Sequence, residues 1–206
     1  MHAVLSLLFG YLVGCINPAR MVAKKKNVNL QKEGTGNLGA TNTALVFGKK
    51  AGYFVLSFDM LKSIFSYKIA RLVFPHLALA GLIAGIGVLI GHAFPIFSNF
   101  QGGKSLASFG GLVLAHDPLQ FVILLTLGII MAFVMNYGVY LAVTAATLFP
   151  IFSFLRSGSL SVFLAAAVAG GIVLALHLGN LRRAITREDP IHTRDGFQKI
   201  FGKKHE

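Results

Sequence analysis

The sequence predicts an all-α protein that crosses a membrane several times. Hydrophobic residues make up 55% of its 206 positions, and only 13% of the residues are charged. The mean hydropathy is +0.71, and the apolar residues collect in runs that approach the length of about 20 residues that a membrane-spanning helix needs. We therefore expect a single integral membrane domain over residues 1–206, in contact with membrane lipids.

Seven apolar runs follow one another along the chain. Their approximate limits are 3–23, 51–74, 77–97, 106–115, 119–135, 139–155 and 160–176. The fourth run corresponds to about 15 Å of helix, which is short for a hydrocarbon core of about 30 Å unless protein or a water-filled cavity surrounds it. In the first run, Gly10 and Gly14 form a G-x-x-x-G pattern that favours close helix packing.

Positive charges predict how these helices are oriented. Lys and Arg concentrate in the loop at 20–50 and in a basic tail at about 182–206. Because loops rich in Lys and Arg stay in the cytoplasm, the number of crossings between them must be odd. We expect seven transmembrane helices, with the N-terminus outside and the C-terminus cytoplasmic. The net charge of +12 then matches anionic lipid headgroups, and nucleic acid is not expected as a partner.

The segment GHAFPIFSNFQGGKSLAS has the composition of an anion site. Gly102 and Gly103 let the backbone approach a ligand closely, Lys104 supplies a positive charge, and Ser105 offers a hydroxyl. The segment is not a nucleotide-binding P-loop, because Ser98 stands where that pattern requires glycine and the preceding run is helical in character. The simpler alternative is a glycine-rich turn whose lysine serves only membrane topology.

The first loop, GTGNLGATN, forms a second candidate anion site. Its glycines allow successive backbone N–H groups to face an oxyanion, and its hydroxyl and amide side chains add hydrogen-bond partners. The candidate residues are Thr35, Gly36, Asn37, Thr41 and Asn42. With the predicted topology, this loop, the GGKS loop, the turn at 136–138 and His177 with Asn180 all lie at the cytoplasmic end. No metal is expected, and a single cysteine, Cys15, excludes an internal disulfide.

Two ionisable residues interrupt the second apolar run. A charge near the middle of a bilayer costs about 2.5–3.5 kcal/mol on insertion scales, so such residues usually pair or line a polar site. Asp59 and Lys62 are three positions apart on one helical face and can pair with each other. We expect either a simple internal salt bridge or a supporting role for the active site.

Four segments, GTGNLGATNTALVFGKK, SFDMLKS, GHAFPIFSNFQGGKSLAS and HLGNLRR, occur in this order. In their order and spacing the chain resembles the bacterial acyl-phosphate:glycerol-3-phosphate acyltransferase family over nearly its whole length. The resemblance implies a seven-helix enzyme of the bacterial inner (cell) membrane with its active site on the cytoplasmic side. Such an enzyme transfers an acyl group from acyl-phosphate to the 1-hydroxyl of glycerol 3-phosphate. The product is lysophosphatidic acid for phospholipid biosynthesis, and the reaction uses no cofactor, acyl-CoA, acyl carrier protein or metal.

The same resemblance implies roles for individual residues. The expected catalytic residues are Lys104, His177 and Asn180, and the supporting residues are Asp59 and Lys62. The expected substrate- and phosphate-binding residues are Thr35, Gly36, Asn37, Thr41, Asn42, His92, Gly102, Gly103 and Ser105. In this scheme Asn42 and Asn180 orient the acceptor. Either His177 or the donor phosphate takes the proton from the acceptor hydroxyl.

Several positions depart from the family pattern. Leu45 stands in place of an arginine expected to clamp a phosphate, and Asn136, Val139 and Ala142 replace other polar residues. Losing a bidentate cationic contact weakens phosphate binding. The alternatives are therefore an acyltransferase with another acceptor, or a catalytically degenerate member that acts as a membrane lipid-binding or regulatory protein. A transporter is disfavoured, because Asp59 and Lys62 are the only mid-bilayer polar pair.

Overall fold

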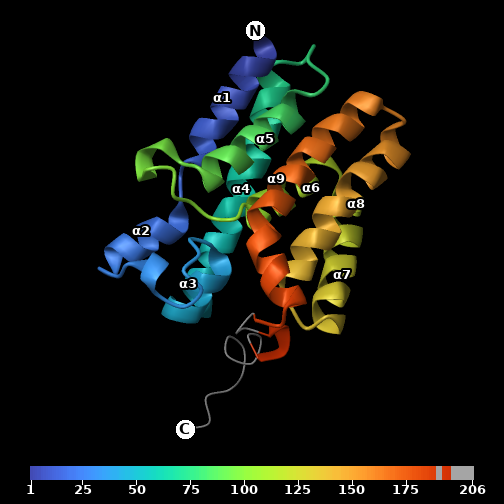
Figure 1. The fold of residues 1–206 in the computed structure, drawn as a ribbon. Coiled ribbons are helices and arrows are strands. Elements are labelled where there is room, and N and C mark those ends of the chain that lie inside the picture. The colour runs from blue at the N-terminus through green and yellow to red at the C-terminus, as the bar shows by residue number, and fades with distance from the viewer. Residues whose placement is uncertain (189–191, 196–206) are drawn as a thin grey trace.

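The computed structural model describes residues 1–188 and 192–195, and within them the regular structure is helical. The α-helices are α1 (His2–Gly14), α2 (Pro18–Lys25), α3 (Ala40–Phe47), α4 (Lys49–Val73), α5 (Ala80–Ala93), α6 (Leu106–His116), α7 (Pro118–Val134), α8 (Val139–Ser157) and α9 (Leu160–Ile185). Two short 3-10 turns, η1 (Leu30–Lys32) and η2 (Ile96–Ser98), lie in the loops. Figure 1 shows the N-terminus at one end of the bundle, with α2, α3 and the last turns of α9 at the opposite end.

The first apolar run, expected as one continuous segment, is divided into α1 and α2. Pro18 occupies the first position of α2, where its missing N–H is not needed, and Asn17 caps this helix by accepting a hydrogen bond from the Arg20 N–H at 2.9 Å. The polar loop that follows also contains a helix that the sequence did not indicate, α3. The other expected runs are each helical.

Small residues bring α1 and α5 into close contact, as the G-x-x-x-G pattern predicts. A Cβ atom at Gly10 would lie 1.9 Å from the carbonyl oxygen of Ala84, and one at Gly87 would lie 2.2 Å from that of Leu7. Only glycine allows the two backbones to approach so closely. The main hydrophobic core lies beside this pair, where Phe109 of α6 and Phe149 of α8 are buried with their rings in an edge-to-face contact.

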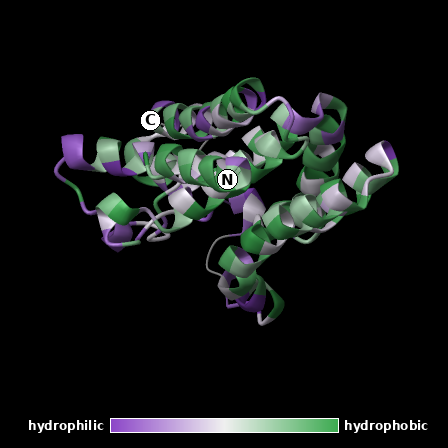
Figure 2. Ribbon diagram, turned by 90° about the horizontal axis from the view of Figure 1, so that it is seen from above, coloured by the Kyte–Doolittle hydropathy of each residue, from purple (hydrophilic) through white to green (hydrophobic). Residues whose placement is uncertain are grey.

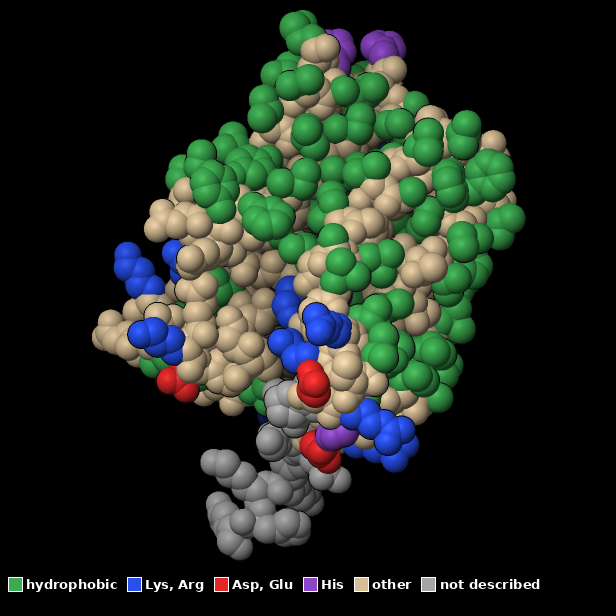
Figure 3. Space-filling view, viewed as in Figure 1, with side chains coloured by type: hydrophobic (Ala, Val, Ile, Leu, Met, Phe, Trp, Pro, Cys, Tyr) green, Lys and Arg blue, Asp and Glu red, His purple; other side chains and the backbone are tan. Residues whose placement is uncertain are grey.

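The surface has the character expected of a membrane protein. Four segments are long and apolar enough to cross a membrane: His2–Lys25, Ala80–Ser98, Val139–Ser157 and Leu160–Ile185. Large apolar side chains such as Leu61, Phe65 and Val122 are exposed, and Figure 2 shows hydrophobic residues along the helices and hydrophilic ones concentrated in the connections. In Figure 3, Lys and Arg side chains gather toward the end that carries α2 and α3.

The short helix α6 is supported by protein. It buries five residues, among them Gly111, where a Cβ would lie 2.3 Å from the carbonyl oxygen of Met60 on α4. This packing meets the condition on which so short an apolar segment is tolerable at membrane depth.

Candidate active site

The first loop is organised by Asn42. This side chain is completely buried: its Oδ1 accepts a hydrogen bond from the Thr35 N–H at 2.7 Å, and its Nδ2 donates to the carbonyls of Leu30 and Glu33, each at 3.1 Å. Gly36 has a φ of +71°, which few other residues adopt. Both ends of the Asn42 amide are therefore used to hold the loop, so its role here is to shape the site.

The hydroxyl and amide side chains of the loop lie nearer its surface. Thr35 and Thr41 are exposed, and Asn37 is half-buried. The Thr35 hydroxyl accepts a hydrogen bond from the backbone N–H of Asn37 at 3.4 Å. Thr41 lies in the first turn of α3, whose N-cap is Gly39.

The GGKS loop packs directly on the end of α5. The Gly103 N–H donates to the carbonyl of His92 at 3.1 Å, and a Cβ at Gly102 would lie 2.0 Å from the same oxygen. Ser105 has a φ of +59°, and its hydroxyl donates to the carbonyl of Leu89 at 2.8 Å. The Ser105 side chain is thus used to attach the loop to α5.

The two glycine-containing loops meet, although they are far apart in sequence. A Cβ at Gly103 would lie 2.7 Å from the carbonyl oxygen of Leu38, and Gln31 donates to the side-chain oxygen of Gln101 at 3.2 Å. Asn17, at the break between α1 and α2, donates to the Leu38 carbonyl at 3.4 Å. The structure therefore places the two candidate anion loops side by side.

Two of the three predicted catalytic residues, His177 and Asn180, lie on α9 and face the third, Lys104, in the GGKS loop. The ammonium of Lys104 donates a hydrogen bond to the side-chain oxygen of Asn180, which also accepts one from Arg183 at 2.9 Å. His177, one turn earlier on α9, is buried and lies 2.8 Å through its Nδ1 from the carbonyl of Val173. A carbonyl can only accept, so Nδ1 carries the proton, and in the neutral ring Nε2 is left as a proton acceptor.

Asp59 and Lys62 form a larger network than the simple pair expected. Lys62 Nζ lies 2.7 Å from Asp59 Oδ1, which confirms the pairing, and 2.9 Å from Nδ1 of the buried His92. Lys62 also donates to the carbonyls of Ile16 at 2.8 Å and Gly14 at 3.3 Å. Sequence reasoning missed these last two contacts, although Pro18 just beyond them indicates a helix break that leaves carbonyls unsatisfied.

The turn at 136–138 has a different environment from the other polar elements. Asn136 accepts hydrogen bonds from the backbone N–H groups of Thr193 at 2.9 Å and Arg194 at 3.2 Å. Val139 and Ala142, where the family pattern has polar residues, are buried among apolar side chains. The turn is therefore tied to the chain beyond α9, and Val139 and Ala142, in the helix α8 that follows the turn, serve packing.

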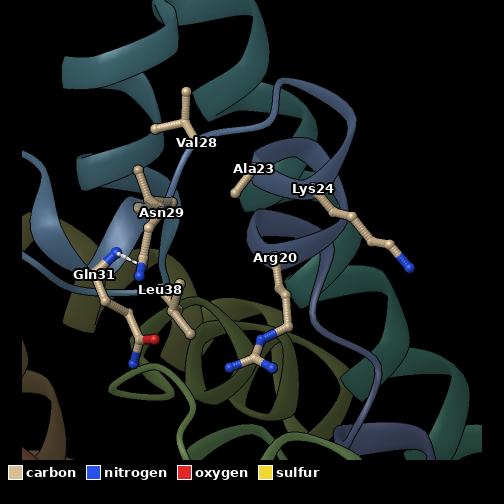
Figure 4. A pocket seen from close by; sticks show the side chains of 8 residues that line it. Arg20, Ala23, Lys24, Val28, Asn29, Gln31 and Leu38 are labelled. Carbon is tan, nitrogen blue, oxygen red and sulfur yellow. Dashed lines mark hydrogen bonds between the residues drawn. The ribbon is translucent and has the colours of Figure 1, made fainter.

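A cavity of about 350 Å³ lies between α2 and the first loop. Figure 4 shows the Arg20 guanidinium and the Gln31 side chain directed to the same side of it, whereas Lys24 points away. The residues that line it include no carboxylate. Within the described part of the chain, the Arg20 guanidinium donates no hydrogen bond to another residue. The cavity therefore favours an anion.

The described residues contain no group of three or more His, Cys, Asp and Glu side chains that could hold a metal ion. The polar groups that converge here are instead backbone amides, two asparagines, one lysine and two histidines. Such donors suit a phosphate ester.

Comparison with known proteins identifies the family of the chain. The family model described as glycerol-3-phosphate acyltransferase matches residues 4–187. The chain belongs to this family. The glycerol-3-phosphate acyltransferase of Aquifex aeolicus is 34% identical over 189 residues, covering 90% of this chain and 97% of the relative. That of Bacillus subtilis is 30% identical over 191 residues, covering 92% and 97%.

Two solved structures share the fold of this glycerol-3-phosphate acyltransferase family member. They are crystal structures of PlsY, an integral membrane glycerol 3-phosphate acyltransferase. The glycerol 3-phosphate form has a TM-score of 0.85 and 30% identity, covering 92% of this chain and 94% of the other. The lysophosphatidic acid form has a TM-score of 0.85 and 28% identity, covering 96% and 99%. The resemblance noted in the sequence is confirmed.

Proposed function

We propose that this chain transfers an acyl group from acyl-phosphate to the 1-hydroxyl of glycerol 3-phosphate and so forms lysophosphatidic acid. The observation that carries the proposal is the contact between Lys104 and Asn180, which joins the GGKS loop to α9 one turn from His177. Related structures bear glycerol 3-phosphate and lysophosphatidic acid in their names, and a substrate and product of this kind fit the donors gathered here.

The reaction is a single displacement. The 1-hydroxyl oxygen attacks the carbonyl carbon of the acyl-phosphate, the bond from that carbon to the phosphate oxygen breaks, and phosphate leaves. Backbone N–H groups near Gly36 and Gly102, together with Lys104, stabilise the leaving phosphate. His177 Nε2 accepts the hydroxyl proton, unless the phosphate itself takes it. Asn180 orients the acceptor.

The proposed setting is a bacterial cell membrane crossed seven times, with the N-terminus outside and the site facing the cytoplasm. Support comes from the concentration of Lys and Arg at the end that carries α2 and α3 (Figure 3). Both phosphate-bearing substrates would then be drawn toward a positively charged end of the protein, and the acyl chain would enter from the lipid.

Arg20 is the residue best placed to replace the cation missing at Leu45. Its guanidinium faces the cavity of Figure 4, and two residues that line this cavity, Gln31 and Leu38, also contact the GGKS loop. A guanidinium binds phosphate through two parallel hydrogen bonds. We assign Arg20 to the phosphate of an incoming substrate.

Because Val139 and Ala142 lack the polar side chains of the family pattern, one alternative is a family member that binds lipid phosphates without turnover. The deciding experiment uses the full chain purified in detergent, with acyl-phosphate added and phosphate release followed with and without glycerol 3-phosphate. Acceptor-dependent release that falls by about 10²-fold or more in Lys104→Ala supports the acyltransferase. Binding of acyl-phosphate without phosphate release would establish the alternative. Phosphate release that depends on a hydroxyl compound other than glycerol 3-phosphate would show that the protein uses a different acceptor.

A further inference from the structure

We propose that residues 94–101, the aromatic loop, insert into the acyl-chain region of the cytoplasmic leaflet and hold the GGKS loop in its working geometry from there. The partner is the hydrocarbon of the bilayer. The inference rests on the proposed function, in which the GGKS loop receives the phosphate of the donor. It adds a membrane contact that a loop makes beside the transmembrane helices, and it gives that contact a role in acyl transfer.

The aromatic loop exposes large apolar side chains and carries no charge. Its sequence, FPIFSNFQ, contains no Asp, Glu, Lys or Arg. Phe94, Ile96, Phe97 and Phe100 are 47, 51, 78 and 57% exposed. Holding such a surface in water forgoes the free energy of burying apolar groups, and contact with lipid hydrocarbon recovers it.

The aromatic loop also lies where a membrane can reach it. The segment Ala80–Ser98, which is long and apolar enough to cross a membrane, continues into it. Figure 1 shows this part of the chain projecting from the side of the bundle, at a level between α2 and the N-terminus. In Figure 3, hydrophobic side chains cover that side, and Lys and Arg side chains gather below them. Aromatic groups next to a belt of positive charge are typical of a lipid–water interface, which favours lipid over a protein partner.

The base of the aromatic loop is joined to the GGKS loop. The Gly103 N–H donates to the carbonyl of His92 at 3.1 Å, so the chain closes on itself just outside the aromatic loop. A Cβ at Gly102 would lie 2.0 Å from the same carbonyl oxygen and 2.8 Å from Cδ of Pro95. With so little space between them, a displacement of the aromatic loop is transmitted to Gly102 and Gly103.

The last turn of the aromatic loop has a strained backbone. Asn99 and Phe100 have φ values of +50° and +57°, in the left-handed region that a bulky residue such as Phe rarely adopts. The Phe100 N–H donates to the carbonyl of Pro95 at 3.1 Å, which closes the turn. Strain of this kind persists only where the surroundings hold it. Burial of the Phe97 and Phe100 rings in lipid would favour the turn and with it the position of the GGKS loop.

Tryptophan fluorescence tests the insertion, because the chain contains no tryptophan of its own. The protein is reconstituted in vesicles of phosphatidylcholine and phosphatidylglycerol. We expect lipids brominated on their acyl chains to quench Phe97→Trp and acrylamide in the water to leave it largely unquenched, as for Leu61→Trp on the exposed face of α4. Lys32→Trp, exposed in η1, should show the opposite pattern. Quenching of Phe97→Trp like that of Lys32→Trp would overturn the proposal and favour a protein partner for this surface.

A second reporter tests whether insertion and activity are linked. With Ile96→Trp as the reporter, we expect Phe97→Ser to weaken quenching by brominated lipid and strengthen quenching by acrylamide. The same change should lower kcat/KM for acyl-phosphate by about tenfold or more, the scale for burying one aromatic ring. Leu155→Ser is the matched control, because Leu155 on α8 is 73% exposed, and it should stay within about threefold of the wild type. Equal activity in the two serine variants, or lost activity with unchanged quenching, would overturn the link.

Failure of this inference is distinguishable from failure of the proposed function, because the quenching needs no substrate. If lipid quenches Phe97→Trp but the protein shows no acyl transfer, the acyltransferase proposal fails and membrane insertion stands. The loss in Phe97→Ser is then measured as a rise in the Kd for acyl-phosphate. Acyl transfer by a protein in which only acrylamide quenches Phe97→Trp would leave the enzyme and remove the aromatic loop from the membrane.

Discussion

Lys104 donates a hydrogen bond to the side-chain oxygen of Asn180 across 76 positions of sequence. The first residue belongs to a glycine-rich loop after α5, and the second to the last turns of α9. Neither element has the means to bind a phosphate ester and orient an acceptor alone. Their contact brings a cation, an amide and the neighbouring His177 to one site.

This contact predicts strongly coupled effects of mutation. We expect Lys104→Ala and Asn180→Ala each to lower kcat/KM by about 10²-fold or more, because in the proposed mechanism Lys104 stabilises the leaving phosphate and Asn180 orients the acceptor. In the double variant the loss should be well short of the product of the single losses, since the two residues act as a unit. The rate of acceptor-dependent phosphate release is measured for the wild type, the two single variants and the double variant. Fully multiplicative losses would show that the residues act independently.

Gly103 should tolerate no side chain. In Gly103→Ala the new methyl would meet His92 Nε2 at 2.3 Å and the Leu38 carbonyl at 2.7 Å, so the two loops must separate. We expect kcat/KM to fall by about tenfold or more, in line with the sensitivity of catalysis to small displacements. Gly138→Ala is the matched control, because a Cβ there meets nothing within 4 Å. Equal activity in the two variants would contradict the packing described.

Arg20 should contribute to substrate binding although it lies outside the motifs. We expect Arg20→Ala to raise the KM for glycerol 3-phosphate by about tenfold, the usual scale for one charge-assisted contact. Lys24 lies on the same helix, but its side chain points away from the cavity (Figure 4). In Lys24→Ala we therefore expect the KM to stay within about threefold of the wild type. Adding Leu45→Arg to Arg20→Ala tests whether the family's arginine restores binding. The same KM in both single variants would exclude a specific role for Arg20.

Asp117 should make stability depend on pH at the α6–α7 connection. Burial alone would raise the pKa of this carboxyl, but the Gln120 N–H and the Arg156 guanidinium, 2.9 Å away, lower its pKa below the usual value. A lowered pKa contributes stability above the unfolded value of about 3.9, and this stability is lost as pH falls through the folded value. We expect the protein to unfold at a lower temperature below about pH 4 than at about pH 7, and thermal unfolding in detergent at the two pH values measures this difference.

Substitution at Asp117 separates its two interactions. Asp117→Asn keeps a side-chain oxygen that can cap α7 but loses the ion pair with the largely exposed Arg156, so we expect a cost of about 0.2–1 kcal/mol. Asp117→Ala also loses the cap and should cost about 0.5–2 kcal/mol more. If Asp117→Asn unfolds with the same pH dependence as the wild type, the carboxyl is not the group that titrates.

The sequence alone determined the class of the molecule and the chemistry of its loops. Apolar runs, charge distribution and the glycine, lysine and asparagine motifs are local properties, and each is visible in a short stretch of residues. They predicted helices in the seven runs, the packing of Gly10 and the pairing of Asp59 with Lys62, all found in the structure.

Tertiary structure decided which of those polar groups are free to meet a ligand. Asn42 and Ser105 look like ligand contacts in sequence, yet their hydrogen bonds are used within the protein. The sequence also did not predict the break in the first apolar run, or the hydrogen bonds from Lys62 to two carbonyls at that break. Hydrogen-bond partners distant in sequence are set by how helices pack, and no local pattern encodes which donor reaches which acceptor.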